Sequence, residues 1–180
     1  MVGLYFGASW CGYCLRFNPI LEVFYKKAPK DKIEIVYVSA CTTEEEHSAY
    51  IKDMPWPTVP YRDARILGYV RKAIRDETGQ QQGRLATMFN VSGLPSLIIL
   101  DSNGSVLRRD GRQDIQEAAA HVDSVLGIWE AALIRKGAPS GKNERTGSGV
   151  NWTTGAGFAL AGAVAAAFIL RSGRRDSGRH

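Results

Sequence analysis

The sequence predicts an α/β domain with a mixed central sheet, in which a β-α-β unit is followed by a β-hairpin and helices flank the sheet. Apolar runs over residues 2–6 and 33–39 have the composition of strands buried on both faces. A helical pattern over residues 11–27 lies between them, so the two strands should be parallel. Strands over 96–100 and 105–109 enclose Asp-Ser-Asn-Gly, which is typical of a hairpin turn.

Further helices are expected around this sheet. The last of them should begin with Asp114 as its N-cap and continue to about Lys136. The others are predicted from apolar spacing and stop signals over residues 43–53, 65–78 and 84–89.

The composition changes after this domain, which should comprise residues 1–136. Residues 137–151 are rich in Gly, Ser and charge, and predict a flexible linker. Residues 152–170 carry no charge and span about 28 Å as a helix, close to the hydrocarbon thickness of a bilayer. We therefore expect a transmembrane helix there, followed by a basic tail over 171–180; an Ala-rich soluble or surface helix is the alternative.

The net charge of +5 does not predict nucleic-acid binding. Residues 1–140 hold 17 Lys and Arg against 16 Asp and Glu, so the excess charge lies in residues 141–180. A neutral domain with basic residues around an apolar segment indicates membrane flanks rather than a DNA or RNA surface.

Cys11 and Cys14 form a Cys-x-x-Cys motif at the junction of a strand and a helix. Unpaired backbone N–H groups at a helix N-terminus favour a thiolate, so Cys11 should be the attacking sulfur. Cys14, one turn further in, should resolve the mixed disulfide. The alternative is half of a zinc site completed by Cys41 and His47, but a structural zinc normally uses a second closely spaced pair, so we expect no metal.

Three further side chains are assigned no role in the chemistry. Cys41 follows a buried strand and is expected to be an inert, partly buried thiol. His47 follows an acidic run and should be solvated, and His121 should lie on a helix surface.

Longer motifs resemble the tryparedoxin and nucleoredoxin branch of the thioredoxin superfamily. Trp-Cys-x-x-Cys alone would indicate only the superfamily, but the combination is more specific and covers roughly residues 2–112. The matching stretches are Tyr-Phe-Gly-Ala-Ser-Trp-Cys over 5–11 with Cys14, Met-Pro-Trp over 54–56 with Val-Pro-Tyr over 59–61, and Phe-Asn-Val-Ser-Gly-Leu-Pro-Ser-Leu-Ile over 89–98.

The resemblance implies a thioredoxin-like fold and a set of substrate-binding residues. Pro95 would be a cis-proline facing the cysteine pair, and the backbone of Leu94 would bind substrate. Trp10 would shield the disulfide and contribute to the docking surface, next to Gly12 and Tyr13. The redox group would be the Cys11–Cys14 disulfide, with no other cofactor.

The chain departs from the family pattern in three places. Gly12-Tyr13 stands where tryparedoxins have Pro-Pro between the cysteines, and Ala40-Cys41 stands where the family commonly has Trp-Asp. The segment over 64–83 is longer than usual. The family also has an additional strand before the first one here, so either Met1 is an internal methionine or the sheet has an exposed edge.

The leading functional hypothesis is a thiol–disulfide oxidoreductase acting on protein disulfides, peroxidases among them. By resemblance its reductant would be a low-molecular-weight dithiol such as trypanothione, or glutathione or a reductase. The alternative is a membrane-tethered binding module whose redox pair senses oxidation. A lumenal disulfide isomerase or cytochrome-maturation protein would need an N-terminal targeting signal, and residues 2–10 do not have the pattern of one.

The position of the apolar segment predicts where the domain resides. A span this close to the C-terminus suggests a tail anchor with the redox domain facing the cytosol. The short, Ala-rich span with basic flanks favours the mitochondrial outer membrane, with the endoplasmic reticulum as the alternative.

If residues 152–170 span a bilayer, the full chain should stay in the membrane pellet through an alkaline carbonate wash, while residues 1–140 should be soluble. Protease added to intact organelles should remove the domain. Release of the full chain at high pH would identify the segment as a surface helix, and protection from protease would reverse the orientation.

Overall fold

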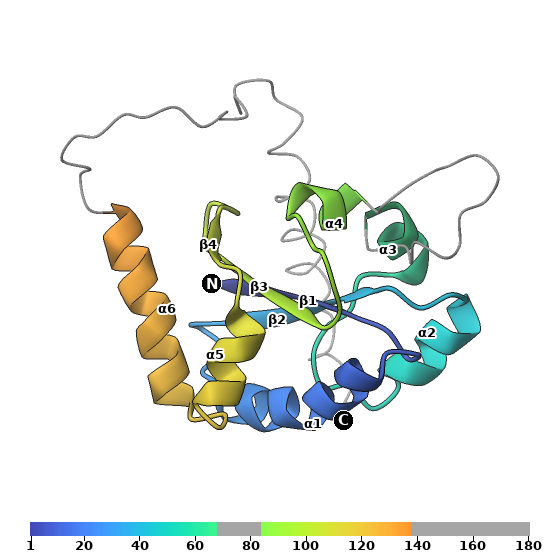
Figure 1. Cartoon of the computed structure of the whole chain (residues 1–180), viewed down its shortest axis with the longest axis horizontal. Helices are drawn as coiled ribbons and strands as arrows, with labels where there is room; N and C mark the ends of the chain where they lie inside the picture. The colour runs from blue at the N-terminus through green and yellow to red at the C-terminus, as the bar shows by residue number, and fades with distance from the viewer. Residues whose placement is uncertain (68–83, 138–180) are drawn as a thin grey trace, which may run out of the picture. The chain divides into compact units, whose positions relative to one another are not determined.

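The computed structural model describes residues 1–67 and 84–137, and Figure 1 shows their arrangement. Four strands form one sheet in the order β2-β1-β3-β4. β1 pairs in parallel with β2 and antiparallel with β3, and β3 pairs antiparallel with β4, which confirms the predicted mixed sheet. The strands are β1 (Val2–Gly7), β2 (Glu34–Ser39), β3 (Ser96–Leu100) and β4 (Val106–Arg108).

The helices follow the predicted order with different boundaries in two places. α3 begins at Tyr61, before the expected helix over 65–78, whose residues 68–78 lie outside the described part. The helix expected from Asp114 to Lys136 is two helices. The bounds are α1 (Gly12–Lys27), α2 (Glu44–Ile51), α3 (Tyr61–Leu67), α4 (Arg84–Met88), α5 (Gly111–Glu117) and α6 (Val122–Gly137).

Alternate residues of the strands pack into two apolar clusters on opposite faces of the sheet, as the two-residue period of a strand requires. On one face, Tyr5 and Ile35 pack with side chains of α1, α5 and α6, where Trp129 is fully buried. On the other face, Leu4 and Val36 pack with side chains of α3 and α4. The sheet therefore lies between two layers of helices, and Figure 1 shows α1 and α5 on the side opposite α4.

The break between α5 and α6 corrects the expectation of one long helix. Ala119 and Ala120 have φ angles of 47° and 59°, in the left-handed region that no helix continues through. Three consecutive alanines favour helix, so local propensity predicted continuation. Tertiary packing overrides it, because the turn brings Trp129 of α6 against Phe24 of α1 with ring centroids 5.6 Å apart.

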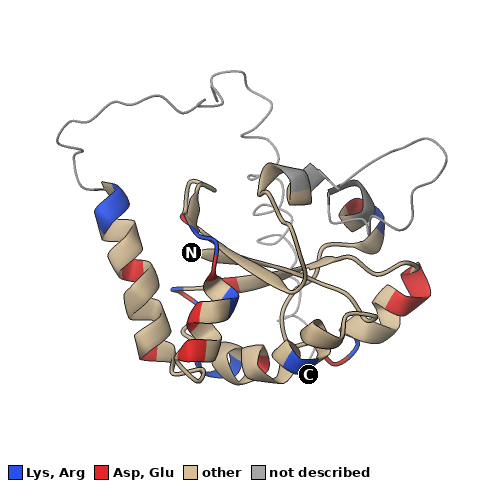
Figure 2. Ribbon diagram, viewed as in Figure 1, with Lys and Arg blue, Asp and Glu red and all other residues tan. Residues whose placement is uncertain are grey.

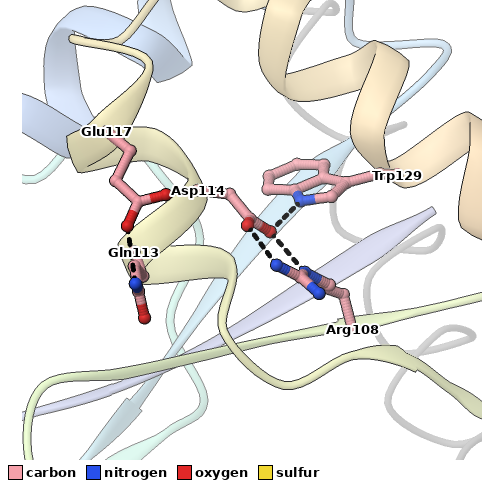
Figure 3. Close-up of polar contacts among 5 residues, drawn as sticks. All are labelled: Arg108, Gln113, Asp114, Glu117 and Trp129. Atoms are coloured by element: carbon pink, nitrogen blue, oxygen red, sulfur yellow. Dashed lines mark hydrogen bonds and ion pairs between the residues drawn. The ribbon is translucent and has the colours of Figure 1, made fainter.

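Asp114 is not the cap of a helix but a buried member of α5, with 2 % of its surface exposed. Its Oδ2 accepts hydrogen bonds from Arg108 Nε at 2.8 Å and from Trp129 Nε1 at 2.9 Å, and its Oδ1 accepts one from Arg108 Nη2 at 2.7 Å (Figure 3). One carboxylate thus joins β4, α5 and α6.

The predicted transmembrane helix over 152–170, the linker over 137–151 beyond its first residue and the basic tail over 171–180 lie outside the described residues. None of the helices within the described part combines the length and apolar character that a membrane crossing requires.

Replacing Asp114 with Ala should lower the free energy of unfolding by about 2–3 kcal/mol, because it leaves the Trp129 N–H and the Arg108 guanidinium without their acceptor. Denaturant unfolding of the full chain measures this change. Glu117→Ala is the matched control: Glu117 is exposed and accepts a hydrogen bond from Gln113 at 2.6 Å (Figure 3), so its loss should change stability by less than about 0.5 kcal/mol. Equal losses in the two variants would contradict the buried role of Asp114.

Candidate functional site

The site lies where the two parallel strands end. In the register of β1 and β2, Gly7 is opposite Ser39, so the segments that follow both strands leave the same edge of the sheet. The Ala40 N–H donates to the Gly7 carbonyl at 2.8 Å and extends this pairing. One segment leads to α1 and the other to α2, whose first turn holds three glutamates, seen in red at the right of Figure 2.

Cys11 is the N-cap residue of α1, as the sequence predicts. Its backbone is extended, with φ −90° and ψ 103°, and its Sγ accepts the backbone N–H of Cys14 at 3.2 Å. An N-cap side chain normally satisfies one of the free N–H groups at a helix start, and here a thiol does so. The sulfur of Cys11 thus accepts a backbone hydrogen bond, while 7 % of the residue stays exposed.

Cys14 lies in the first turn of α1 and is fully buried. Burial is the main reason that the pKa of the Cys14 thiol is raised, and a hydrogen bond with Cys11 raises it further. Smaller contributions from the Ala8 backbone and the Tyr5 hydroxyl favour the thiolate. Cys14 is therefore a thiol at neutral pH, out of reach of an external disulfide but one helical turn from Cys11.

The residues around the pair differ in exposure. The Trp10 indole N–H donates to the Ala40 carbonyl at 3.1 Å, which fixes the ring while 37 % of the residue stays exposed. Tyr13 is 66 % exposed, and the Arg16 guanidinium lies 4.6 Å from the centre of its ring. Among residues 1–67 and 84–137, a Cβ placed on Gly12 would meet no heavy atom within 4 Å other than its chain neighbours and the backbone of its own helix. The surface beside Cys11 is thus aromatic and open.

The Leu94–Pro95 peptide bond is cis, as the resemblance implies. Pro95 is buried and directly precedes β3, and the half-buried Leu94 packs against the cluster that contains Cys11 and Cys14. The roles of Leu94 and Pro95 toward a substrate remain predictions.

The family model described as thioredoxin-like matches residues 1–106. The chain belongs to the thioredoxin-like family. Probable nucleoredoxin 1 of Arabidopsis thaliana is 35 % identical over 111 residues, which are 61 % of this chain and 17 % of that protein. The chain therefore corresponds to only a part of that nucleoredoxin.

Solved tryparedoxin structures are similar to this thioredoxin-like chain in both sequence and fold. Tryparedoxin from Trypanosoma brucei is 28 % identical, with a TM-score of 0.54 and coverage of 68 % of this chain and 76 % of that one. Tryparedoxin II complexed with glutathionylspermidine is also 28 % identical, with a TM-score of 0.52 and coverage of 64 % and 72 %.

Cys41 lies closer to Cys11 and Cys14 than its sequence position suggests. It is buried in the same cluster as Cys11 and Cys14, its Sγ accepts the Ser9 N–H at 3.5 Å, and the Tyr37 hydroxyl lies 3.7 Å from it. The parallel strands explain this position, because residues just after β2 lie beside those just after β1. The parallel pairing was predicted from the sequence. Extending it two residues beyond Ser39 would have placed Cys41 beside the segment that leads to Cys11.

The expectation that His47 is solvated is wrong. His47 is buried, stacks on the Tyr37 ring with centroids 6.2 Å apart and lies 5.4 Å from the Tyr61 ring. Within the described part of the chain its Nδ1 has no hydrogen-bond partner. It shares one face of α2 with Tyr50 and Ile51, three and four residues later, and this spacing was the missed signal. His121 is exposed, as expected, but it lies just before α6 rather than on a helix.

A polar cluster beneath Cys14 was also missed. The Tyr5 hydroxyl donates to Asn18 Oδ1 at 2.6 Å, and Asn18 Nδ2 donates to the Tyr50 hydroxyl at 2.9 Å. The three residues come from β1, α1 and α2, so no local motif reveals them.

Within residues 1–67 and 84–137, no group of three or more His, Cys, Asp or Glu side chains is placed to hold a metal ion. Cys11, Cys14 and Cys41 are free thiols in the structure.

The burial of His47 predicts a pH-dependent stability. Burial holds the pKa of His47 below its usual value, against a smaller opposing effect of Glu44. The unfolded chain therefore binds a proton more readily than the folded one, and the free energy of unfolding should fall as the pH drops below about 6.5. Denaturant unfolding between pH 7.5 and 5 should show a smaller fall in His47→Phe, whose ring still stacks on Tyr37.

His121→Gln, at an exposed position, is the control and should retain the full decline. Identical pH profiles for the wild type and His47→Phe would refute this account of His47.

Proposed function

We propose that the chain is a thiol–disulfide oxidoreductase that transfers reducing equivalents to protein disulfides through Cys11 and Cys14. The observation that carries this proposal is the geometry of the pair: one thiol caps a helix and is partly accessible, and a second is buried one turn deeper. Membership of the thioredoxin-like family and similarity to tryparedoxins support it.

In the proposed reaction, the Cys11 thiolate attacks one sulfur of a substrate disulfide. The substrate S–S bond breaks, a mixed disulfide forms at Cys11, and the first substrate thiol leaves with a proton from solvent. Cys14 then attacks Cys11 Sγ, which forms the Cys11–Cys14 disulfide and releases the second substrate thiol. The substrate gains two electrons and two protons overall, and the cysteine pair loses two electrons.

A reductant must return two electrons to the Cys11–Cys14 disulfide. We infer a low-molecular-weight dithiol such as trypanothione, or glutathione or a reductase, because a related tryparedoxin II is complexed with glutathionylspermidine. Peroxidases are proposed among the protein substrates by the same resemblance. The exposed Trp10 and Tyr13 would contact the substrate, with Gly12, Leu94 and Pro95 completing the surface.

We further propose that residues 152–170 tether this domain to a membrane with the domain facing the cytosol, at the mitochondrial outer membrane or, as the alternative, the endoplasmic reticulum. The support is the absence of charge in this segment and the basic residues on both sides.

Single substitutions can test whether Cys11 attacks the substrate and Cys14 resolves the mixed disulfide. Cys11→Ser should lower insulin disulfide reduction by at least about a hundredfold, because only a thiolate attacks disulfides efficiently. Cys14→Ser should also lose turnover, but it should accumulate mixed disulfides with its substrates, visible on non-reducing gels.

Cys41→Ser is the matched control, since Cys41 is 8 % exposed, close to the 7 % of Cys11. Its turnover should stay near that of the wild type. Full activity in Cys11→Ser, or mixed disulfides formed equally by both single variants, would refute the proposed roles.

A further inference from the structure

α6 is apolar on its outer face as well as on the face that packs into the core. Three of its residues are buried in the core, whereas Ile128, Leu133 and Ile134 are 39 %, 41 % and 73 % exposed. Over residues 125–134 the helix carries one charged side chain, Glu130, and its carboxylate is already held in an ion pair. A helix with apolar residues on both faces is typical of a buried or membrane-bound helix, so the outer face of α6 indicates a contact beyond the domain.

The exposed apolar residues lie beside basic ones in the last turn of α6. Arg135 and Lys136 directly follow Ile134, and Figure 2 shows this end of the helix in blue. Lys136 binds Asp101 at 2.8 Å, whereas Arg135 makes no ion pair among the described residues. A guanidinium next to exposed aliphatic side chains fits a surface that offers both phosphate groups and hydrocarbon, which is the surface of an anionic bilayer.

This end of α6 lies at the opposite end of the sheet from the cysteine pair. Lys136 binds Asp101, the residue directly after β3. The antiparallel register places Leu100 of β3 against Val2, the first residue of β1, whereas Cys11 follows the last. The six residues of β1 span about 17 Å between these two ends. Figure 1 agrees, because the N-terminus of β1 lies on the side of α6 and α2 lies on the opposite side.

The chain continues from α6 toward the proposed membrane span. Residues 138–151 separate α6 from residues 152–170, and a Gly- and Ser-rich coil of this length would have an r.m.s. end-to-end distance of about 20 Å. This segment carries two further basic residues, Lys142 and Arg145, against one acidic residue, Glu144. Because α6 is joined directly to it, the end of α6 is the part of the domain that a tether would hold nearest to a bilayer.

We propose that the C-terminal end of α6 docks on an anionic bilayer and holds the redox site on the side of the domain that faces away from it. The inference rests on the proposed membrane tether. Leu133 and Ile134 enter the headgroup region, and Arg135 binds lipid phosphates. The contact is weak by itself, but the tether supplies a high effective concentration. Protein disulfides in the aqueous phase then reach Cys11 without displacing the domain from the membrane.

The test places a genetically encoded, environment-sensitive fluorescent amino acid at position 134 of the full chain, in vesicles of phosphatidylcholine and phosphatidylglycerol. This label leaves all three cysteines in place. Its emission should shift to shorter wavelength and should be quenched by lipids that are brominated along their acyl chains. The matched control position is Leu15, an apolar residue of α1 that is 52 % exposed near Cys11, where the same label should remain unquenched.

A charge substitution tests the role of Arg135. In the chain labelled at position 134, Arg135→Gln should lower the ratio of docked to undocked domain about fivefold, because one basic residue near an anionic surface contributes about 1 kcal/mol. Vesicles of phosphatidylcholine alone should lower this ratio at least as much. Arg62→Gln is the matched control, since Arg62 is an exposed arginine of α3, and it should leave the ratio unchanged.

Three outcomes would overturn the inference. An unquenched label at position 134 in a chain that stays with the vesicles, or equal quenching at positions 134 and 15, would do so and leave the tether standing. A shift to shorter wavelength without quenching would also do so, because it would show that protein, either a second copy or residues 152–170, covers α6. Release of the full chain from the vesicles by an alkaline carbonate wash would refute the tether and this inference with it.

Discussion

The parallel pairing of β1 with β2 determines the position of every group in the site. Because Gly7 lies opposite Ser39, the two chains that leave these strands run side by side, and the Ala40 N–H holds the second to the end of the first. α1 then begins beside the segment that leads to α2. The N-cap thiol, the aromatic ring of Trp10 and the polar groups of α2 meet only because both strands end at the same edge, where α/β sheets generally bind their ligands.

The difference between the two thiols follows from this arrangement and from the geometry of a helix start. At the N-cap, Cys11 keeps 7 % of its surface exposed and its sulfur accepts a backbone N–H, whereas Cys14 in the first turn of the helix is fully buried. Burial penalises charge on Cys14, so the environment that shields this thiol from solvent also disfavours its ionisation.

The sequence predicted the four strands, the parallel pair, the hairpin and the position of Cys11 at the start of a helix, because each depends on residues close together in the chain. The exceptions depend on distant contacts. Ala118, Ala119 and Ala120 favour helix locally, but the packing of Trp129 on Phe24 and its hydrogen bond to Asp114 require a turn there. His47 follows three glutamates, but its face of α2 is covered by aromatic rings from β2 and α3.

The tyrosine and asparagine cluster shows why part of a site stays hidden in a single sequence. Tyr5 and Tyr50 are 45 positions apart, and in the sequence both are ordinary aromatic residues of an apolar face. Their hydroxyls become informative only when Asn18 is seen to join them beneath Cys14. The exposed residues beside the cysteines could be identified from the sequence alone. Gly12 and Tyr13 lie within the Cys-x-x-Cys motif, at the positions where the resemblance gives Pro-Pro in tryparedoxins. The buried side of the cysteine pair is therefore built by contacts between distant segments, whereas its exposed side at Tyr13 can be read directly from the motif.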